Sequence, residues 1–153
     1  MRSLSPHKGL DVKRMPFASK KMKPTLVIGL KAELQHRVVT EELLSSIYPG
    51  GPPVLATPFV LGLMEQAAAR AIQPHLDPGE ASVGYGFEFH HLAPTPDGAT
   101  VVAMAEVTSV EKNLVTFAIE ARDHVDVVAR GTHVRAVIDM ERFMKRVKRK
   151  SAR

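Results

Sequence analysis

The sequence predicts an α+β domain in which a curved antiparallel sheet wraps around a long central helix. Three observations lead there: an apolar helical stretch from 58 to 73, one extended run before it, and four alternating runs after it. A chain of 153 residues, 44% of them hydrophobic, is long enough for one domain with a real core. Because consecutive strands with short connections tend to pair, we expect the last four strands to form a meander.

The central helix has clear start and stop signals. Thr57 is placed as an N-cap, Pro58 suits the first helical position, and Gln73 is followed by a proline. The only charged residues of the stretch are Glu65 and Arg70, so the helix should be buried nearly all round. A lone carboxylate in such a helix is costly unless it is paired or used, so the rest of the chain should give Glu65 a partner.

The other elements are predicted from the alternation of apolar residues and from the Gly and Pro residues that interrupt helices and strands. We expect a strand over 31–39, a short helix capped by Thr40 up to about Tyr48, and a loop over 48–53. The later strands are expected at 81–92, 100–110, 114–122 and 127–138, followed by a basic helix over 141–150. Unless a bulge intervenes, strict alternation places His91 on the face of Val83, Tyr85, Phe87 and Phe89, and turns His90 to water.

Charge divides the chain into three parts. Residues 1–24 carry seven Lys or Arg and one acid, 142–153 carry seven and no acid, and 25–141 have a net charge of −8. We expect a disordered basic leader over 1–24, a domain over 25–141, and a basic C-terminal helix or tail over 142–153. Met22 is an alternative start, and a mitochondrial presequence is an alternative reading of the leader. The basic ends are either solvated or attract an anionic partner.

Several classes of protein are excluded or disfavoured. There is no cysteine, and no metal motif, phosphate loop or nucleophile elbow, so we expect neither a metal nor a cofactor. No apolar run has the length of a membrane span, and no secretion signal is present, so we expect a cytoplasmic protein that binds no membrane. The acidic domain makes nucleic acid an unexpected partner.

Five ionisable or hydroxyl residues lie in apolar settings and are candidates for chemistry: Thr57, Glu65, His91, His133 and Arg135. Gly62 lies one turn before Glu65 on the same helix face, and a glycine there is easiest to explain if something approaches closely. Each candidate also has a structural reading: Glu65 as half of an ion pair, Thr57 as a cap, and each histidine as a core residue.

Three segments carry a resemblance to a known family. They are Thr57-Pro58-Phe59-Val60-Leu61-Gly62-Leu63-Met64-Glu65, Gly84 seven residues before His91, and Gly131-Thr132-His133-Val134-Arg135-Ala136-Val137-Ile138. They resemble the fluoroacetyl-CoA thioesterase family of hotdog-fold enzymes, over about residues 22–148. The resemblance implies a hotdog fold, a homodimer or larger homo-oligomer with active sites at the subunit interface, and an acyl-CoA substrate.

The resemblance also implies roles for residues. Thr57, Glu65 and His91 would be catalytic, and Gly84 and Arg135 would contact the substrate. Glu65 would attack the thioester carbonyl or activate water, and a nearby His91 or Arg135 would favour its charged form. His91 would assist proton transfer, Thr57 would orient the reacting group, and a backbone N–H, such as that of Gly84, would hold the oxyanion.

One segment departs from the family pattern. The branch selective for fluoroacetyl-CoA has a longer Phe-bearing segment where this chain has only Gly50-Gly51-Pro52-Pro53. We therefore expect an acyl-CoA thioesterase acting on a short acyl chain. The alternatives are a non-catalytic acyl-CoA-binding hotdog module and a hotdog dehydratase. The basic ends would then be solvated tails or would attract coenzyme A phosphates or nucleic acid.

Overall fold

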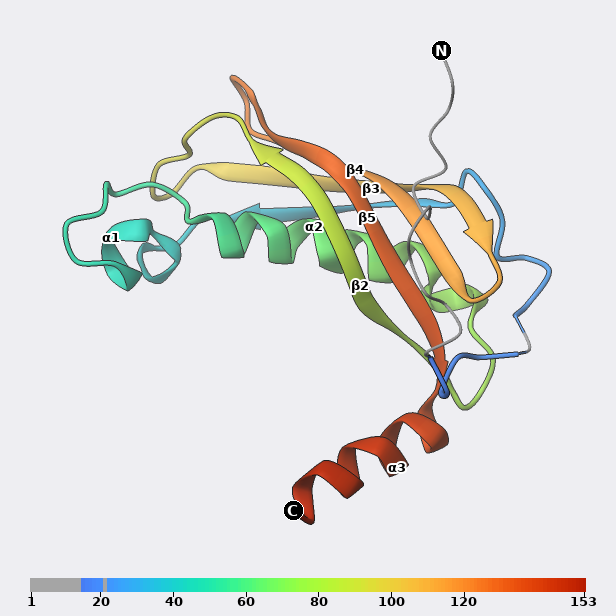
Figure 1. Ribbon diagram of the computed structural model, residues 1–153. Helices are drawn as coiled ribbons and strands as arrows, with labels where there is room; N and C mark the ends of the chain where they lie inside the picture. The colour runs from blue at the N-terminus through green and yellow to red at the C-terminus, as the bar shows by residue number, and fades with distance from the viewer. Residues whose placement is uncertain (1–14, 21) are drawn as a thin grey trace.

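The computed structural model describes residues 15–20 and 22–153, and it has the predicted α+β architecture (Figure 1). Five strands form one antiparallel sheet that curves over a long helix. In chain order the elements are β1 (Lys31–Arg37), η2 (Thr40–Glu42), α1 (Leu44–Ile47), α2 (Thr57–Ile72), η3 (Gln73–His75), β2 (Glu80–His91), β3 (Thr100–Glu111), β4 (Leu114–Arg122), β5 (Val127–Asp139) and α3 (Met140–Ser151).

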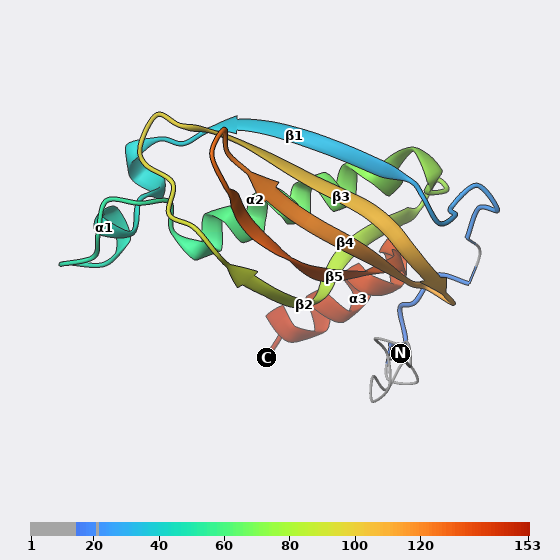
Figure 2. The same ribbon diagram turned by 90° about the horizontal axis from the view of Figure 1, so that it is seen from above.

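The strand order β1-β3-β4-β5-β2 corrects one expectation. Strands β3, β4 and β5 form the predicted meander, but β2 pairs with β5 rather than with β3 (Figure 2). The connection between β2 and β3 contacts the segment just before α2: Leu55 N–H donates to the Thr95 carbonyl at 2.8 Å, and Val54 bridges Pro96. These contacts lead the chain across to β3 and leave β2 as an edge strand.

Helix α2 packs on the concave face of the sheet. Its buried side chains meet those of β1, β3 and β4 in the main core; on the helix they are Val60, Leu63, Met64, Ala67, Ala68, Ala71 and Ile72. The expectation of burial all round is wrong for one side of the helix, where Phe59, Gln66 and Arg70 are exposed. That side has no other described element packed over it, so α2 is buried on one face only.

Two predicted caps are absent. Ala56 takes the cap position of α2, and Thr57 is the first helical residue and makes no capping hydrogen bond. The hydroxyl of Thr57 bonds to a strand residue instead. In the short helical segment, Val39 rather than Thr40 takes the cap position, and its N–H donates to the Glu42 carboxylate at 3.1 Å.

A β-bulge in β2 changes which residues face α2. The register with β5 shifts between Gly84 and Gly86. Val83 before the shift and Tyr85 within it pack in a small cluster on the outer face of the sheet, whereas Phe87 and Phe89 after it pack against the main core. The extra residue therefore breaks the uniform alternation, and it brings Ser82 and Gly84 to the same face as His91.

Residues 15–20 dock onto the end of the sheet, unlike the expectation of disorder for that part of the leader. Ala18 bridges Ile138, and the rings of Phe17 and Phe143 meet edge to face with centroids 5.1 Å apart. The rest of the expected leader, 1–14 and 21, lies outside the described residues. Helix α3 begins at the same end of the sheet, next to Phe17, with Asp139 as its N-cap, and then extends away from the sheet. No described helix is both long and apolar enough to cross a membrane.

Candidate functional site

Thr57 and His91 form one group of candidate residues, which we call the hydroxyl–imidazole pair. They lie at the N-terminus of α2 and the end of β2, and Thr57 Oγ1 is 2.9 Å from His91 Nδ1. His91 Nε2 is buried and has no hydrogen-bond partner among the described residues. Partial burial lowers the pKa of His91, opposed by a backbone interaction with Ala93. A neutral imidazole with an uncommitted nitrogen can accept a proton from a reacting group.

Glu65 and Arg135 belong to a second group, which we call the arginine cluster. Arg135 Nη1 donates to Glu65 Oε1 at 3.1 Å, so the expected partner of Glu65 is present. The other nitrogens of Arg135 are also committed: Nε donates to Ser82 Oγ at 3.0 Å and Nη2 to the Ser82 carbonyl at 2.9 Å. Arg135 is 5% exposed, whereas the side chain of Glu65 is 41% exposed. The cation is fixed in the sheet, and the carboxylate it holds is accessible.

His133 completes the arginine cluster from the interior. It is fully buried and stacks on Phe87, with ring centroids 3.8 Å apart. Its Nδ1 lies 2.9 Å from the Gly86 carbonyl, which can only accept, so Nδ1 carries the proton. Nε2 is then an acceptor, and it lies 3.3 Å from Arg135 Nη1. Burial lowers the pKa of His133 to about 4, so the ring is neutral near pH 7.

Gly84 lies directly against the carboxylate of Glu65. A Cβ atom at this position would be 2.6 Å from Glu65 Oε1, closer than real Cβ contacts, so the missing side chain makes room for the carboxylate. Gly62, the helix glycine noted in the sequence, has no such close neighbour, since a Cβ there would meet nothing within 4 Å among the described residues. Nothing in this chain therefore explains Gly62, which lies on the same helix face as Glu65.

The hydroxyl–imidazole pair and the arginine cluster do not meet within the described chain. Thr57 and Glu65 are eight residues apart on α2, which is about 12 Å along a helix. No hydrogen bond or ion pair among the described residues joins His91 to Glu65. Of the predicted site residues, the structure thus brings Glu65, Gly84 and Arg135 together in one place and Thr57 and His91 in another.

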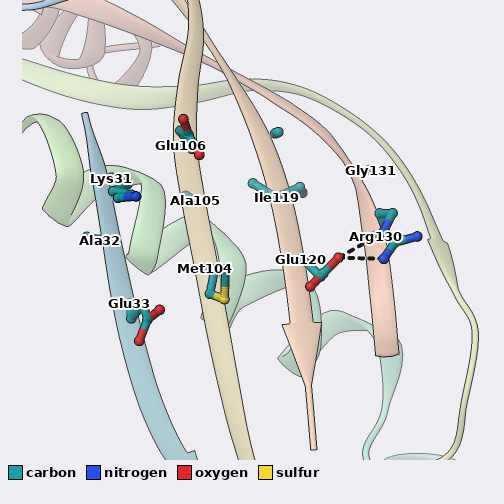
Figure 3. A pocket seen from close by; sticks show the side chains of 11 residues that line it. Lys31, Ala32, Glu33, Met104, Ala105, Glu106, Ile119, Glu120, Arg130 and Gly131 are labelled. Carbon is teal, nitrogen blue, oxygen red and sulfur yellow. Dashed lines mark hydrogen bonds and ion pairs between the residues drawn. The ribbon is translucent and has the colours of Figure 1, made fainter. Parts of the chain in front are cut away.

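A cavity lies away from both groups. It has a volume of about 330 Å³ and opens on the outer face of β1, β3, β4 and β5, opposite α2 (Figure 3). Glu120 and Arg130 form an ion pair there at 2.7 Å, and Met104 supplies apolar surface. None of the five candidate residues lines it, so its size alone does not make it the reactive site. Among the described residues, no cluster of His, Asp and Glu could hold a metal ion.

Sequence reasoning did not identify two members of the arginine cluster, Ser82 and the Gly86 carbonyl. Ser82 shares its parity with Gly84, two residues later, which is the one signal that could have pointed to it. The role of the Gly86 carbonyl depends on the bulge, which alternation alone does not locate. His133 was a candidate, but the resemblance assigned it no role.

Comparisons with known proteins agree with this architecture. The model of the family described as fluoroacetyl-CoA-specific thioesterase matches residues 39–141. The fluoroacetyl-CoA thioesterase of Streptantibioticus cattleyicolor is 38% identical over 136 residues, covering 85% of this chain and 98% of that protein.

Solved structures point the same way. A fluoroacetyl-CoA thioesterase structure has a TM-score of 0.77 at 38% identity, covering 82% of this chain and 97% of the other. A hot-dog-like protein from Thermanaerovibrio acidaminovorans has a TM-score of 0.75 at 28% identity, covering 80% and 91%. The predicted hotdog fold is thereby confirmed, and the chain belongs to the fluoroacetyl-CoA-specific thioesterase family.

Proposed function

We propose that this protein is a thioesterase that hydrolyses a short-chain acyl-CoA to the free acid and coenzyme A. One observation carries the proposal beyond family membership. The carboxylate of Glu65 is held by the buried Arg135, lies against the side-chain-free position of Gly84, and is still 41% exposed. A fixed, charged and accessible carboxylate is what a nucleophile or general base requires.

In the proposed mechanism, Glu65 either takes a proton from the water that attacks the thioester carbon, or attacks that carbon itself to give an acyl-Glu65 anhydride that water then hydrolyses to the free acid. In both routes the C–S bond breaks and the coenzyme A thiolate leaves. His91 accepts a proton released from the attacking water and passes it to the thiolate. Thr57 orients the reacting group through its hydroxyl. Gly84 and Arg135 form the substrate side of the site, where the Gly84 backbone lies beside the carbonyl and Arg135 keeps Glu65 oriented.

The proposal requires two copies of the chain. Glu65 does not meet the pair in its own chain, since Thr57, to which His91 is hydrogen-bonded, is about 12 Å away along α2. Strand β2 is a 12-residue edge strand, and an exposed edge of that length is a ready surface for pairing. The side of α2 with Phe59 and Gln66 is also exposed. We propose a homodimer or larger homo-oligomer in which Glu65 of one chain meets the hydroxyl–imidazole pair of another.

Mixing inactive variants tests this arrangement. Glu65→Gln and His91→Ala should each be inactive alone. In random dimers from equal amounts, half would be mixed, each with one complete site, so about a quarter of the wild-type activity should return. Recovery near zero, with mixed dimers confirmed by mass spectrometry, would show that each chain builds its own site.

Thiol release from a panel of acyl-CoA esters tests the reaction itself. Hydrolysis of acetyl-CoA or propionyl-CoA would support a thioesterase, whereas tight binding without release would support the non-catalytic module. Hydration of an enoyl-CoA without thiol release would support the dehydratase. Because only the four residues Gly50–Pro53 separate Tyr48-Pro49 from the approach to α2, we expect no strong preference for fluoroacetyl-CoA over acetyl-CoA.

A further inference from the structure

We propose that His133 is a positioning residue that, in its neutral form, holds Arg135 against Glu65, and that protonation of His133 turns the site off at acid pH. The proposal rests on the proposed thioesterase function, because its readouts include turnover. It assigns a role to a buried histidine that touches neither substrate nor the reacting carboxylate.

The surroundings of His133 favour one tautomer of its ring. The Gly86 carbonyl accepts from Nδ1–H at 2.9 Å, the ring stacks on Phe87, and Phe117 lies further away with centroids 6.1 Å apart. Exchanging the two ring nitrogens would break the hydrogen bond to Gly86. In this orientation the Nε2 lone pair points at Arg135 Nη1, 3.3 Å away.

Arg135 would lose a partner without this acceptor. Ser82 holds Nε and Nη2 and so fixes one edge of the guanidinium. Nη1 is the nitrogen that meets Glu65, and His133 is its other described partner. Nη1 is thus held between a fixed acceptor inside the sheet and the accessible carboxylate outside it. Loss of the inner acceptor would leave a buried N–H unsatisfied and would favour a shift of the guanidinium.

A proton on His133 would change this arrangement. On protonation, Nε2 becomes a donor that faces the donor Nη1, and two cations would lie beside each other in the interior. The ionisable groups that act on His133 are Arg135 on its own strand and Glu65 from α2. Strand β2 faces the ring with Phe87 and the Gly86 carbonyl, and β4 with Phe117. Glu65 is the only one of these groups that would stabilise the charged ring, so protonation would draw Glu65 away from its catalytic position.

The test compares two substitutions at this position. His133→Gln keeps an acceptor for Arg135 but cannot be protonated there, so it should retain at least a third of kcat and lose the part of the acid decline, centred near pH 4, that protonation of His133 should cause in the wild type. His133→Leu removes the acceptor and should lower kcat by tenfold or more with less than a threefold change in KM. His90→Gln, an exposed histidine on β2, is the matched control and should leave both unchanged.

A purely structural role predicts a different result. Both variants would then lose stability alike, kcat per folded molecule would stay normal, and the acid decline would be the same as in the wild type. That outcome overturns the proposal.

A second measurement does not depend on turnover or on the variants folding. Nitrogen-15 NMR of the histidines in the wild-type protein should show one ring that keeps the neutral Nδ1–H tautomer at pH 5. If the buried histidine carries its proton on Nε2, or is charged at pH 5, the proposal fails even if the protein hydrolyses acyl-CoA. If no acyl-CoA is hydrolysed but this tautomer is found, the proposed function fails and the positioning geometry stands.

Discussion

The hydroxyl–imidazole pair and the arginine cluster are built from the same helix and sheet by opposite means. Thr57 and His91 meet through one hydrogen bond, near the ends of two elements, and Thr57 is exposed. Arg135 instead is buried and bonded to Ser82, His133 and Glu65. Stability and chemistry should therefore be separable at the pair and at the accessible Glu65, and linked at the buried Arg135 and His133, where a buried cation depends on its partners.

Glu65→Gln should show the largest effect on activity. The amide keeps the shape of the side chain but cannot act as nucleophile or base, so thiol release should fall by about 10² or more. Because Gln can still accept from Arg135 and the side chain at this position is 41% exposed, we expect the melting temperature to change little. If the variant instead unfolds several degrees earlier and each folded molecule still turns over normally, Glu65 is only a structural partner of Arg135.

Acid should destabilise the cluster through His133. Its folded pKa, about 4, is below the ordinary value of 6.5, so the folded state binds fewer protons than the unfolded state between these pH values. This contribution to stability is complete above pH 6.5 and disappears as the pH falls to about 4. It should amount to about 2–3 kcal/mol. Urea melts at pH 7 and pH 4.5 measure the loss, which His133→Gln should reduce; His91, whose pKa is also lowered, contributes in the same direction.

Gly84→Ala should weaken the cluster without touching the pair. The new methyl group would lie 2.6 Å from Glu65 Oε1, and the flexible carboxylate would move aside. A displacement of about 1 Å of a reacting group costs up to about 10² in rate, so we expect a ten- to hundredfold loss of kcat. Gly62→Ala is the control for adding a methyl group one helical turn from Glu65 without a clash, since a Cβ there meets nothing within 4 Å among the described residues. Equal activity of Gly84→Ala and wild type would remove Gly84 from the site.

Thr57→Val should give the smallest effect on stability. The side chain is exposed and does not cap α2, so the free energy of unfolding should change by less than about 0.5 kcal/mol. Loss of the hydrogen bond to His91 should lower the rate about tenfold. Thr57→Ser, which keeps the hydroxyl, should recover most of the rate. If valine is as active as threonine, the pair has no catalytic role.

Much of the fold follows from local pattern, and the site follows only partly. The apolar stretch after Thr57 and the alternation over 114–122 predicted α2 and β4 almost to the residue. Both segments have start and stop signals or a hydrophobic periodicity that is typical of the element they form. The pairing of β2 with β5 joins residues that lie far apart in the sequence, such as Phe87 and His133, and no local pattern contains it.

The contact between Glu65 and Arg135 spans seventy residues, and composition suggested only that a partner was needed. The side of α2 that stays exposed could not be predicted either, since apolar side chains surround Glu65 on most faces of the helix. The separation of the hydroxyl–imidazole pair from the arginine cluster is a matter of helix rise and could have been computed from the spacing of Thr57 and Glu65.

The β-bulge of β2 has a consequence for how this strand can change over evolutionary time. One extra residue divides the strand into two halves with opposite alternation, so the apolar side chains of the first half pack on the outer face of the sheet and those of the second half pack toward α2. Substitutions at Val83 or Tyr85 alter the outer surface that Phe17 and Phe143 cover, while those at Phe87 or Phe89 alter the core under α2. The two surfaces can therefore diverge independently, and a lineage could remodel how the chain ends dock without disturbing the residues that hold Glu65.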